Sequence, residues 1–190
     1  LEINHRQIQA LNYRGYYLLK TKQYDKAITD LDAVLAQNTK YVQAYYNNGL
    51  AYNGKRDFAR AVKSFSEAIK LRPRAGDIYR KRAFAYMRLN NYAKAIEDYD
   101  RLITLWPTAA LAYNAKAWAY YKAGEPEKGL SVVNKALEIQ PDYAKAYDTR
   151  GHIYEMLGKT QKAHADFKKA HGLEPANPYR KAQMKKRGLL

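Results

Sequence analysis

The chain contains no cysteine, which excludes disulfide bonds and thiolate metal sites. Long hydrophobic runs are also missing, since apolar runs reach only about five residues, as in Ala83–Met87, and about 20 are needed to span a bilayer. No run of five like charges occurs, and the first residues lack the pattern of a signal peptide. We therefore expect a soluble chain, and the sequence does not distinguish the cytoplasm from the periplasm.

Acidic residues are scarce. Lys and Arg number 34 against 18 Asp and Glu, so the net charge is +16 and the pI is about 9.8. Such a balance favours nucleic acid, an anionic lipid surface or an acidic peptide as partner. The charge is uneven, because the segment 42–75 carries +5, the tail from Pro178 carries +5, and the segment 110–143 is neutral.

A period of 34 residues runs without insertion from Ile8 to Asn177. It is visible in four columns of equivalent residues: Tyr45, Tyr79, Tyr113 and Tyr147; Tyr52, Tyr86, Tyr120 and Tyr154; Ala27, Ala61, Ala95, Gly129 and Ala163; and Pro73, Pro107, Pro141 and Pro175. A fixed period of this size is typical of stacked-repeat proteins, in which each unit contacts its neighbours. A further small-residue column (Gly15, Gly49, Ala83, Ala117, Gly151) predicts close approach of two helices in every unit.

One unit predicts two antiparallel helices. Apolar and small residues recur at steps of three and four between Gln43 and Asn53, which indicates a first helix. We expect the Asn53–Gly54 pair to end that helix, because both residues tolerate left-handed dihedrals. A second helix is predicted from an N-cap at Asp57 to Leu71, and Pro73 then prevents its continuation.

These columns closely resemble the tetratricopeptide repeat. In the third unit, Tyr79, Ala83, Tyr86, Tyr92, Ala95, Tyr99 and Pro107 match the bulky, small, aromatic and proline positions of that motif. The resemblance covers about nine-tenths of the chain and is greatest to bacterial members. It implies an all-α, right-handed superhelical solenoid of antiparallel helix pairs. The expected parts are a lead-in at 1–7, five repeats at 8–41, 42–75, 76–109, 110–143 and 144–177, and a C-terminal capping helix at 178–190.

In this family the inner face of the first helices lines a concave groove. Projected onto this sequence, the resemblance places fifteen residues there, which differ from repeat to repeat: Asn12, Tyr13, Tyr16, Tyr46, Asn47, Leu50, Arg80, Lys81, Phe84, Arg88, Asn114, Trp118, Tyr121, Lys122 and His152. Tyr46, Phe84 and Trp118 predict an aromatic ladder flanked by Arg80 and Arg88. Such a surface suits a peptide with apolar and acidic side chains. Alternatively, some of these aromatics cover an N-terminal extension or an adjoining protomer, which would mean self-association.

The carboxylate clamp of the family's best-known subgroup is not expected here. Its positions, aligned on the first repeat, hold Asn12, Tyr16, Asn47, Asp77 and Lys81. Asn47 fits, Lys81 fits loosely, and Asp77 would repel a carboxylate.

No enzyme, cofactor or metal site is predicted. Gly158–Thr160 resembles the end of a phosphate-binding loop, but Ile153 stands where its first glycine should be. His164 and His171 lack a third ligand, and no serine has a histidine in helical reach. The sequence thus predicts a non-enzymatic scaffold that binds a peptide segment of a partner protein. The alternative is a basic solenoid that binds nucleic acid or an anionic surface, motivated by the net charge.

Overall fold

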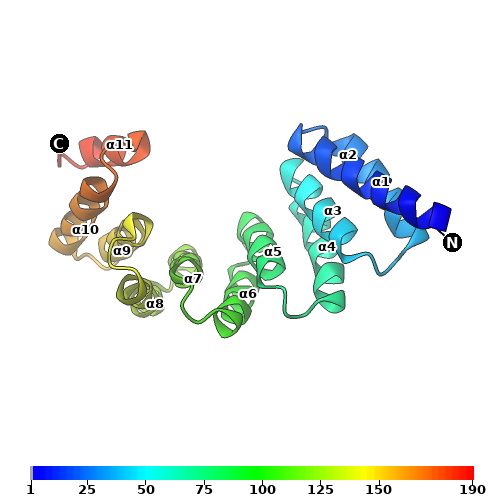
Figure 1. Ribbon diagram of the computed structural model, residues 1–190. Helices are drawn as coiled ribbons and strands as arrows, with labels where there is room; N and C mark the ends of the chain where they lie inside the picture. Colours follow the sequence, from blue (N-terminus) through cyan, green and yellow to red (C-terminus); the bar gives the residue numbers. More distant parts are fainter. Residues whose placement is uncertain (1) are drawn as a thin grey trace. The chain divides into compact units, whose positions relative to one another are not determined.

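Helices joined by short turns make up most of the described chain. The computed structural model describes the backbone of residues 2–190 and the side chains from Arg6 onward, and within these residues it contains eleven α-helices and no strand (Figure 1). They are α1 (Glu2–Lys20), α2 (Tyr24–Gln37), α3 (Val42–Gly54), α4 (Phe58–Leu71), α5 (Gly76–Arg88), α6 (Tyr92–Leu105), α7 (Ala110–Ala123), α8 (Pro126–Ile139), α9 (Ala144–Met156), α10 (Thr160–Leu173) and α11 (Pro178–Lys186). The predicted all-α class is confirmed.

The chain divides into two compact units, one ending at Asn91 and the other beginning at Tyr92. In unit 1, α1 packs on α2 and α3 packs on α4, and in unit 2 the corresponding pairs are α7 with α8 and α9 with α10. From Glu2 onward, the residues predicted as a lead-in form the first turns of α1, whereas Leu1 lies outside the described residues.

Close approach of paired helices depends on the small-residue column, as predicted. A Cβ atom on Gly49 would lie 2.6 Å from the ring of Phe65, and one on Gly151 would lie 2.6 Å from the ring of Phe167. Both phenylalanines are almost fully buried, at 0% and 3% exposure. The missing side chains of α3 and α9 therefore provide the space into which the aromatic rings of α4 and α10 pack.

The turn between paired helices differs from the prediction at Asn53–Gly54. Helix α3 continues through Gly54, and the left-handed residue is Arg56, with φ of 64°. Gly54 is small for another reason, because a Cβ atom there would lie 2.4 Å from the ring of Tyr24. The left-handed position repeats with the period of the chain and is occupied by Lys22, Arg56, Asn90, Gly124 and Gly158. The expected N-cap at Asp57 is confirmed, since its carboxylate accepts from the Arg60 backbone N–H at 3.0 Å.

Helix α11 covers the end of the last repeat, which confirms the predicted capping helix. Met184 is 2% exposed and packs with Ala163 and Phe167. Asn177 is its N-cap, and the Asn177 side chain accepts from the backbone N–H groups of Tyr179 and Arg180. Met184 of α11 thus covers the hydrophobic cluster at the end of unit 2, and Leu189 packs against the same cluster.

Candidate functional sites in the two units

The predicted contact residues of unit 1 begin with two exposed tyrosines on α1. Tyr13 is 71% exposed and Tyr16 is 43% exposed, and the ammonium of Lys20 lies 5.2 Å from the centre of the Tyr16 ring. Tyr46 of α3 is half-buried, with its ring 6.0 Å from that of Phe65. Tyr46 therefore contributes to the packing of α3 on α4 as well as to the surface.

Asn12 and Asn47 lie in the interior, although the sequence placed them among the contact residues. Asn12 is 6% exposed and Asn47 is 1% exposed. The Asn47 amide donates to Asn12 Oδ1 at 3.5 Å, and Gln43 donates to Asn47 Oδ1 at 3.0 Å. Asn47 thus has a partner on each side of its amide, one of them across the contact between α1 and α3, as buried polar groups require. Leu50 is half-buried and packs on the hydrophobic core around Phe65.

Helix α5 carries an exposed aromatic between cations. Phe84 is 49% exposed, and its ring meets the ring of Phe58 edge to face at 6.4 Å. The guanidinium of Arg88 lies 5.3 Å from the Phe58 ring centre. One side of Phe84 is thus fixed by Phe58 while the other half of its surface stays open.

Lys81 is a half-buried cation with no ion pair among the described residues. Burial lowers the pKa of the Lys81 ammonium below its ordinary value, and the charge of Arg80 lowers it further. The negative charge of Asp77 raises this pKa and offsets part of the decrease. Lys20 of α1 adds a smaller repulsion. This part of unit 1 therefore holds positive charge that its own carboxylates do not neutralise.

Unit 2 has a continuous row of ring contacts. Trp118 lies 4.8 Å from Tyr121 and 5.7 Å from His152, measured between ring centres, and His152 lies 5.1 Å from Phe167. Edge-to-face and tilted geometries of this kind are favourable for aromatic pairs. The sequence placed Trp118, Tyr121 and His152 on one surface, and the structure brings all three together.

Asn114 and Lys122 also belong to α7 in unit 2. Lys122 is exposed, whereas Asn114 is half-buried and its Oδ1 atom is buried without a hydrogen bond to the described residues. The Asn114 side chain hydrogen-bonds the Tyr143 hydroxyl, which opposes the rise that burial causes in the pKa of Tyr143.

The surroundings of His152 disfavour its protonated form. Burial lowers the pKa of the His152 imidazole, the positive charge of Arg187 lowers it further, and Glu155 opposes both. Arg187 forms two hydrogen bonds with Glu155, at 2.6 and 2.9 Å, and its guanidinium lies 4.0 Å from the centre of the Phe167 ring. The hydrogen bond from Arg187 in turn lowers the pKa of Glu155.

The interactions of Arg180 in α11 and of Arg187 at its C-terminal end were missed by sequence reasoning. Arg180 is 3% exposed, donates to Asp148 Oδ2 at 2.7 Å and pairs with Glu174. Burial raises the pKa of Asp148, and the charge of Arg180 opposes that rise. A repeated spacing in the sequence could have indicated these two ion pairs, because Arg180 follows Asp148 by 32 residues and Arg187 follows Glu155 by 32. The C-terminal segment therefore already binds these two carboxylates of α9.

A polar column between helices was also missed. Its members recur every 34 residues and bond to second helices 16 residues away in sequence: Arg14 to Asp30, Asn48 to Asp32, Arg82 to Ser66, Lys116 to Asp100, and Arg150 to both Asp166 and Asn134. Asp30 is 7% exposed and Asp166 is 5% exposed, so these partners are buried carboxylates. The column links each first helix to an adjacent second helix by hydrogen bonds.

Neither a metal cluster nor a membrane span emerges from the described part of the chain. Residues 6–190 contain no group of three His, Asp or Glu side chains placed to hold a metal ion. None of the helices described has the length and apolarity to cross a bilayer.

Solved structures of similar fold include several tetratricopeptide repeat proteins. MamA 41-end from Desulfovibrio magneticus RS-1 superposes with a TM-score of 0.82 at 21% identity, covering 90% of this chain and 97% of that one. YrrB, described as a TPR protein with an unusual peptide-binding site, gives 0.76 at 20% identity over 93% and 90%. TTC0263, a thermophilic TPR protein in Thermus thermophilus, gives 0.72 at 19% identity over 96% and 100%. At these identities the likeness concerns the fold.

Sequence matches identify the family. Superkiller complex protein 3 of Homo sapiens is 36% identical over 62 residues, which is 33% of this chain, and the chain spans 4% of the length of that relative. Tetratricopeptide repeat profiles match residues 13–77, 46–110 and 80–144, and a second such profile matches residues 133–165. The chain belongs to the tetratricopeptide repeat family, whose fold is typical of protein-interaction scaffolds.

Proposed function

We propose that this protein binds a peptide segment of a partner protein, and that the segment carries apolar and acidic side chains. The observation that carries the proposal is the half-buried, unneutralised Lys81 beside the exposed ring of Phe84. An acidic side chain of a ligand would neutralise Lys81 and Arg80, while an apolar one would cover Phe84. No catalytic group is needed for this role.

The contact surface of unit 1 consists of the exposed residues Tyr13, Tyr16, Phe84 and Arg88 and of the half-buried cations Arg80 and Lys81. Asn12 and Asn47 are left out because their amides are buried against each other. Tyr46 and Leu50 form the floor of this surface rather than its anchors, since both are half-buried on the core.

Unit 2 offers its own contact surface, centred on Trp118 and Tyr121. His152 lies between their rings and Phe167 and its pKa is lowered, so it supports the aromatic row rather than providing a charge at neutral pH. Lys122, the residue after Tyr121, is exposed, whereas Asn114 is half-buried and hydrogen-bonds Tyr143, so Asn114 is left out of this surface.

The test is fluorescence anisotropy with a labelled peptide in which Leu and Glu alternate. We expect Phe84→Ala and Trp118→Ala each to weaken binding by about tenfold or more, because central aromatics dominate such interfaces. The matched control is Trp106→Ala, since Trp106 is 46% exposed but lies in the turn after α6. Equal losses in the control and in the two variants would show that the peptide does not use these surfaces.

Lys81→Met separates binding from stability. Removing a half-buried, repelled cation should stabilise the protein by about 1 kcal/mol, which raises the melting temperature by a few degrees. The same change should weaken binding of the acidic peptide. The folded pKa of Lys81 is lowered, so wild-type stability should rise with pH as the pH passes from that value to the ordinary 10.5, and the variant should lose this rise. A variant that binds the peptide as tightly as wild type would contradict the role of Lys81.

The net charge of +16 keeps nucleic acid as the second candidate. Arg56, Lys63, Arg72 and Arg74 are exposed, have no ion pair among the described residues, and lie along α4 and the turns at both of its ends. A mixed-sequence single-stranded oligonucleotide that binds more tightly than the Leu–Glu peptide at physiological salt, with a steep salt dependence, would establish this alternative instead.

A further inference from the structure

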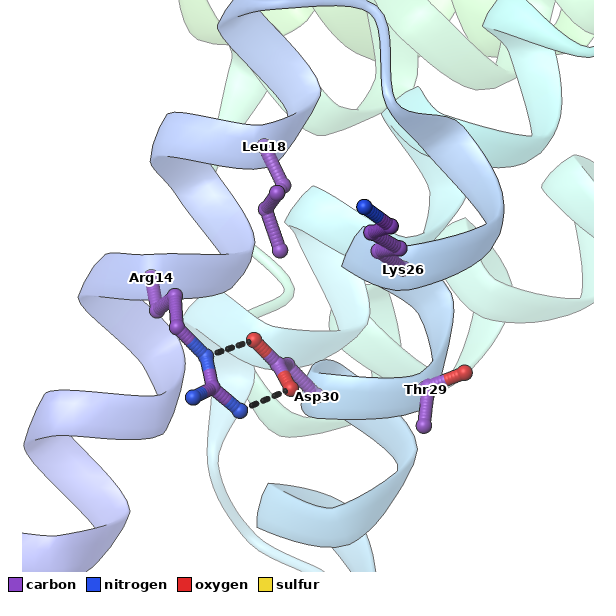
Figure 2. A pocket seen from close by; sticks show the side chains of 5 residues that line it. All are labelled: Arg14, Leu18, Lys26, Thr29 and Asp30. Atoms are coloured by element: carbon purple, nitrogen blue, oxygen red, sulfur yellow. Dashed lines mark hydrogen bonds and ion pairs between the residues drawn. The ribbon is translucent and has the colours of Figure 1, made fainter.

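A cavity of about 330 Å³ lies on the first helix pair, away from the predicted contact residues. It is lined by Arg14 and Leu18 of α1 and by Lys26, Thr29 and Asp30 of α2, and Figure 2 shows Leu18 in the space between the two cations. Nothing in the proposed peptide-binding role uses this place.

The cavity occurs where the first repeat departs from the other four. Leu18 occupies the column that holds Tyr52, Tyr86, Tyr120 and Tyr154 in the later repeats. A leucine side chain ends before the region that a phenol ring would fill. The hollow is therefore the space of a missing aromatic ring.

In the later repeats that ring contacts one or two cations. The Tyr120 ring centre lies 5.6 Å from Lys116 and 5.9 Å from Lys128. In the last repeat the Tyr154 ring centre lies 5.8 Å from Arg150 and 5.9 Å from Lys162. Cation–π contacts of this kind stabilise an aromatic ring within about 6 Å of an ammonium or guanidinium group.

Both cations are present around the cavity although the ring is not. Arg14 corresponds to Lys116 and Arg150 in the 34-residue period, and Lys26 corresponds to Lys128 and Lys162. Lys26 bonds only Gln23, at 3.2 Å, among the described residues. The first repeat thus keeps both sides of a ring-binding site whose centre is open.

The hydrogen bonding of Arg14 is also incomplete by comparison with Arg150. Each arginine uses Nε and Nη2 to bond a buried aspartate, at 2.6 and 2.7 Å for Arg14 and at 2.7 and 2.8 Å for Arg150. Arg150 Nη1 also donates to Asn134 of α8 at 2.9 Å, whereas Arg14 Nη1 has no partner among the described residues. The Arg14 side chain is 65% exposed and that of Arg150 is 22% exposed.

The surface around the cavity corresponds to one that is buried against protein in the other repeats. Tyr17 is 65% exposed, while its equivalents Ala51, Ala85 and Ala119 are each 0% exposed. Tyr17 precedes Leu18, a residue that lines the cavity, and its aromatic side chain is open to contact. A polypeptide, which can offer a side chain and a backbone or side-chain oxygen together, matches this surface.

We propose that this cavity binds an aromatic side chain, most simply a tyrosine, of a partner polypeptide that also places an oxygen acceptor at Arg14 Nη1. The ring lies between the Arg14 guanidinium and the Lys26 ammonium and contacts Leu18, as the protein's own tyrosines lie in repeats four and five. The site is separate from the contact surfaces of the proposed function, so each can fail without the other.

The experiment is a titration with N-acetyltyrosinamide followed by methyl NMR of Leu18 and Thr29. We expect saturable upfield shifts of these methyl signals, half-complete at about 1–10 mM as suits one small ring. N-acetyl-leucinamide at the same concentration should cause no such shift. Leu18→Tyr fills the cavity with its own ring, so the Thr29 methyl, the signal that this variant retains, should no longer respond to the probe. Equal shifts with both probes, no shift with either, or an unchanged response in Leu18→Tyr would overturn the proposal.

Thermal unfolding of the same variant gives an independent check. Leu18→Tyr restores the residue of the other four repeats, so its melting temperature should rise by roughly 1–4 °C, while the control Leu18→Met should change it little. A melting temperature below that of wild type would mean that the cavity cannot hold a ring. Loss of the proposed Leu–Glu peptide binding in Leu18→Tyr would also contradict the separation of the two sites.

Discussion

Replacing Gly151 with alanine should destabilise unit 2, although alanine is the better helix former. The added Cβ atom would lie 2.6 Å from Cε1 and 2.9 Å from Cδ1 and Cζ of Phe167. Three ring atoms this close require a shift of the ring or of α9 against α10. Phe167 is 3% exposed and its ring also contacts His152 and Arg187, so it has little room to move.

The magnitude follows from two opposing effects. Overpacking of a dense core costs about 1–3 kcal/mol, and the gain in helix propensity from Gly to Ala returns up to about 1 kcal/mol. We therefore expect a net loss of roughly 1–2 kcal/mol. The matched control is Gly172→Ala in α10, because nothing lies within 4 Å of a Cβ atom at Gly172. The control should gain the helix propensity without the overpacking.

Urea unfolding followed by circular dichroism measures both changes. The expected result is a lower midpoint for Gly151→Ala and an equal or higher one for Gly172→Ala, with unchanged slopes. Adding Phe167→Leu to Gly151→Ala should recover part of the loss, since the two residues are in contact and their effects should not add. Equal destabilisation by the two glycine replacements would refute the argument from close approach.

Two further predictions concern the turns and the capping helix. Lys22→Gly and Arg56→Gly should each stabilise the protein by up to about 1 kcal/mol, because φ is 60° and 64° at these positions and glycine adopts such values without strain. A melting temperature below that of wild type would show that the left-handed strain is absent. Arg187→Gln should reduce stability at neutral pH by about 1 kcal/mol. Since Arg187 lowers the pKa of Glu155 below 4.5, this loss should be present above pH 4.5 and should vanish as the pH falls through the folded pKa; a loss that does not change with pH would contradict the pairing.

The repeat period was sufficient to predict the helix pairs, the close-approach glycines and the cap. Gly49 and Gly151 recur in phase, and a position that is small in every copy has one physical explanation, the nearness of a neighbouring helix. The same argument misled at Gly54, where glycine suggested a turn. Its smallness instead makes room for Tyr24, a contact with a residue from the previous repeat.

The candidate site was harder to predict, because residues that vary between repeats can be interior as well as exposed. Asn12 and Asn47 vary like ligand contacts, yet they form one buried amide pair that only a three-dimensional neighbourhood reveals. The capping helix was predicted without partners for Arg180 and Arg187, although each pairs with a carboxylate on α9. Partner choice among long polar side chains depends on geometry, which composition does not specify.

The position of the two tryptophans has a spectroscopic consequence. Trp106 and Trp118 are the protein's only tryptophans, and both lie in unit 2, one half-exposed and the other within the aromatic row. Tryptophan emission therefore reports on unit 2 alone, whereas circular dichroism reports on the helices of both units. If the two signals change at different denaturant concentrations, the units unfold separately, and a single free energy of unfolding does not describe the chain.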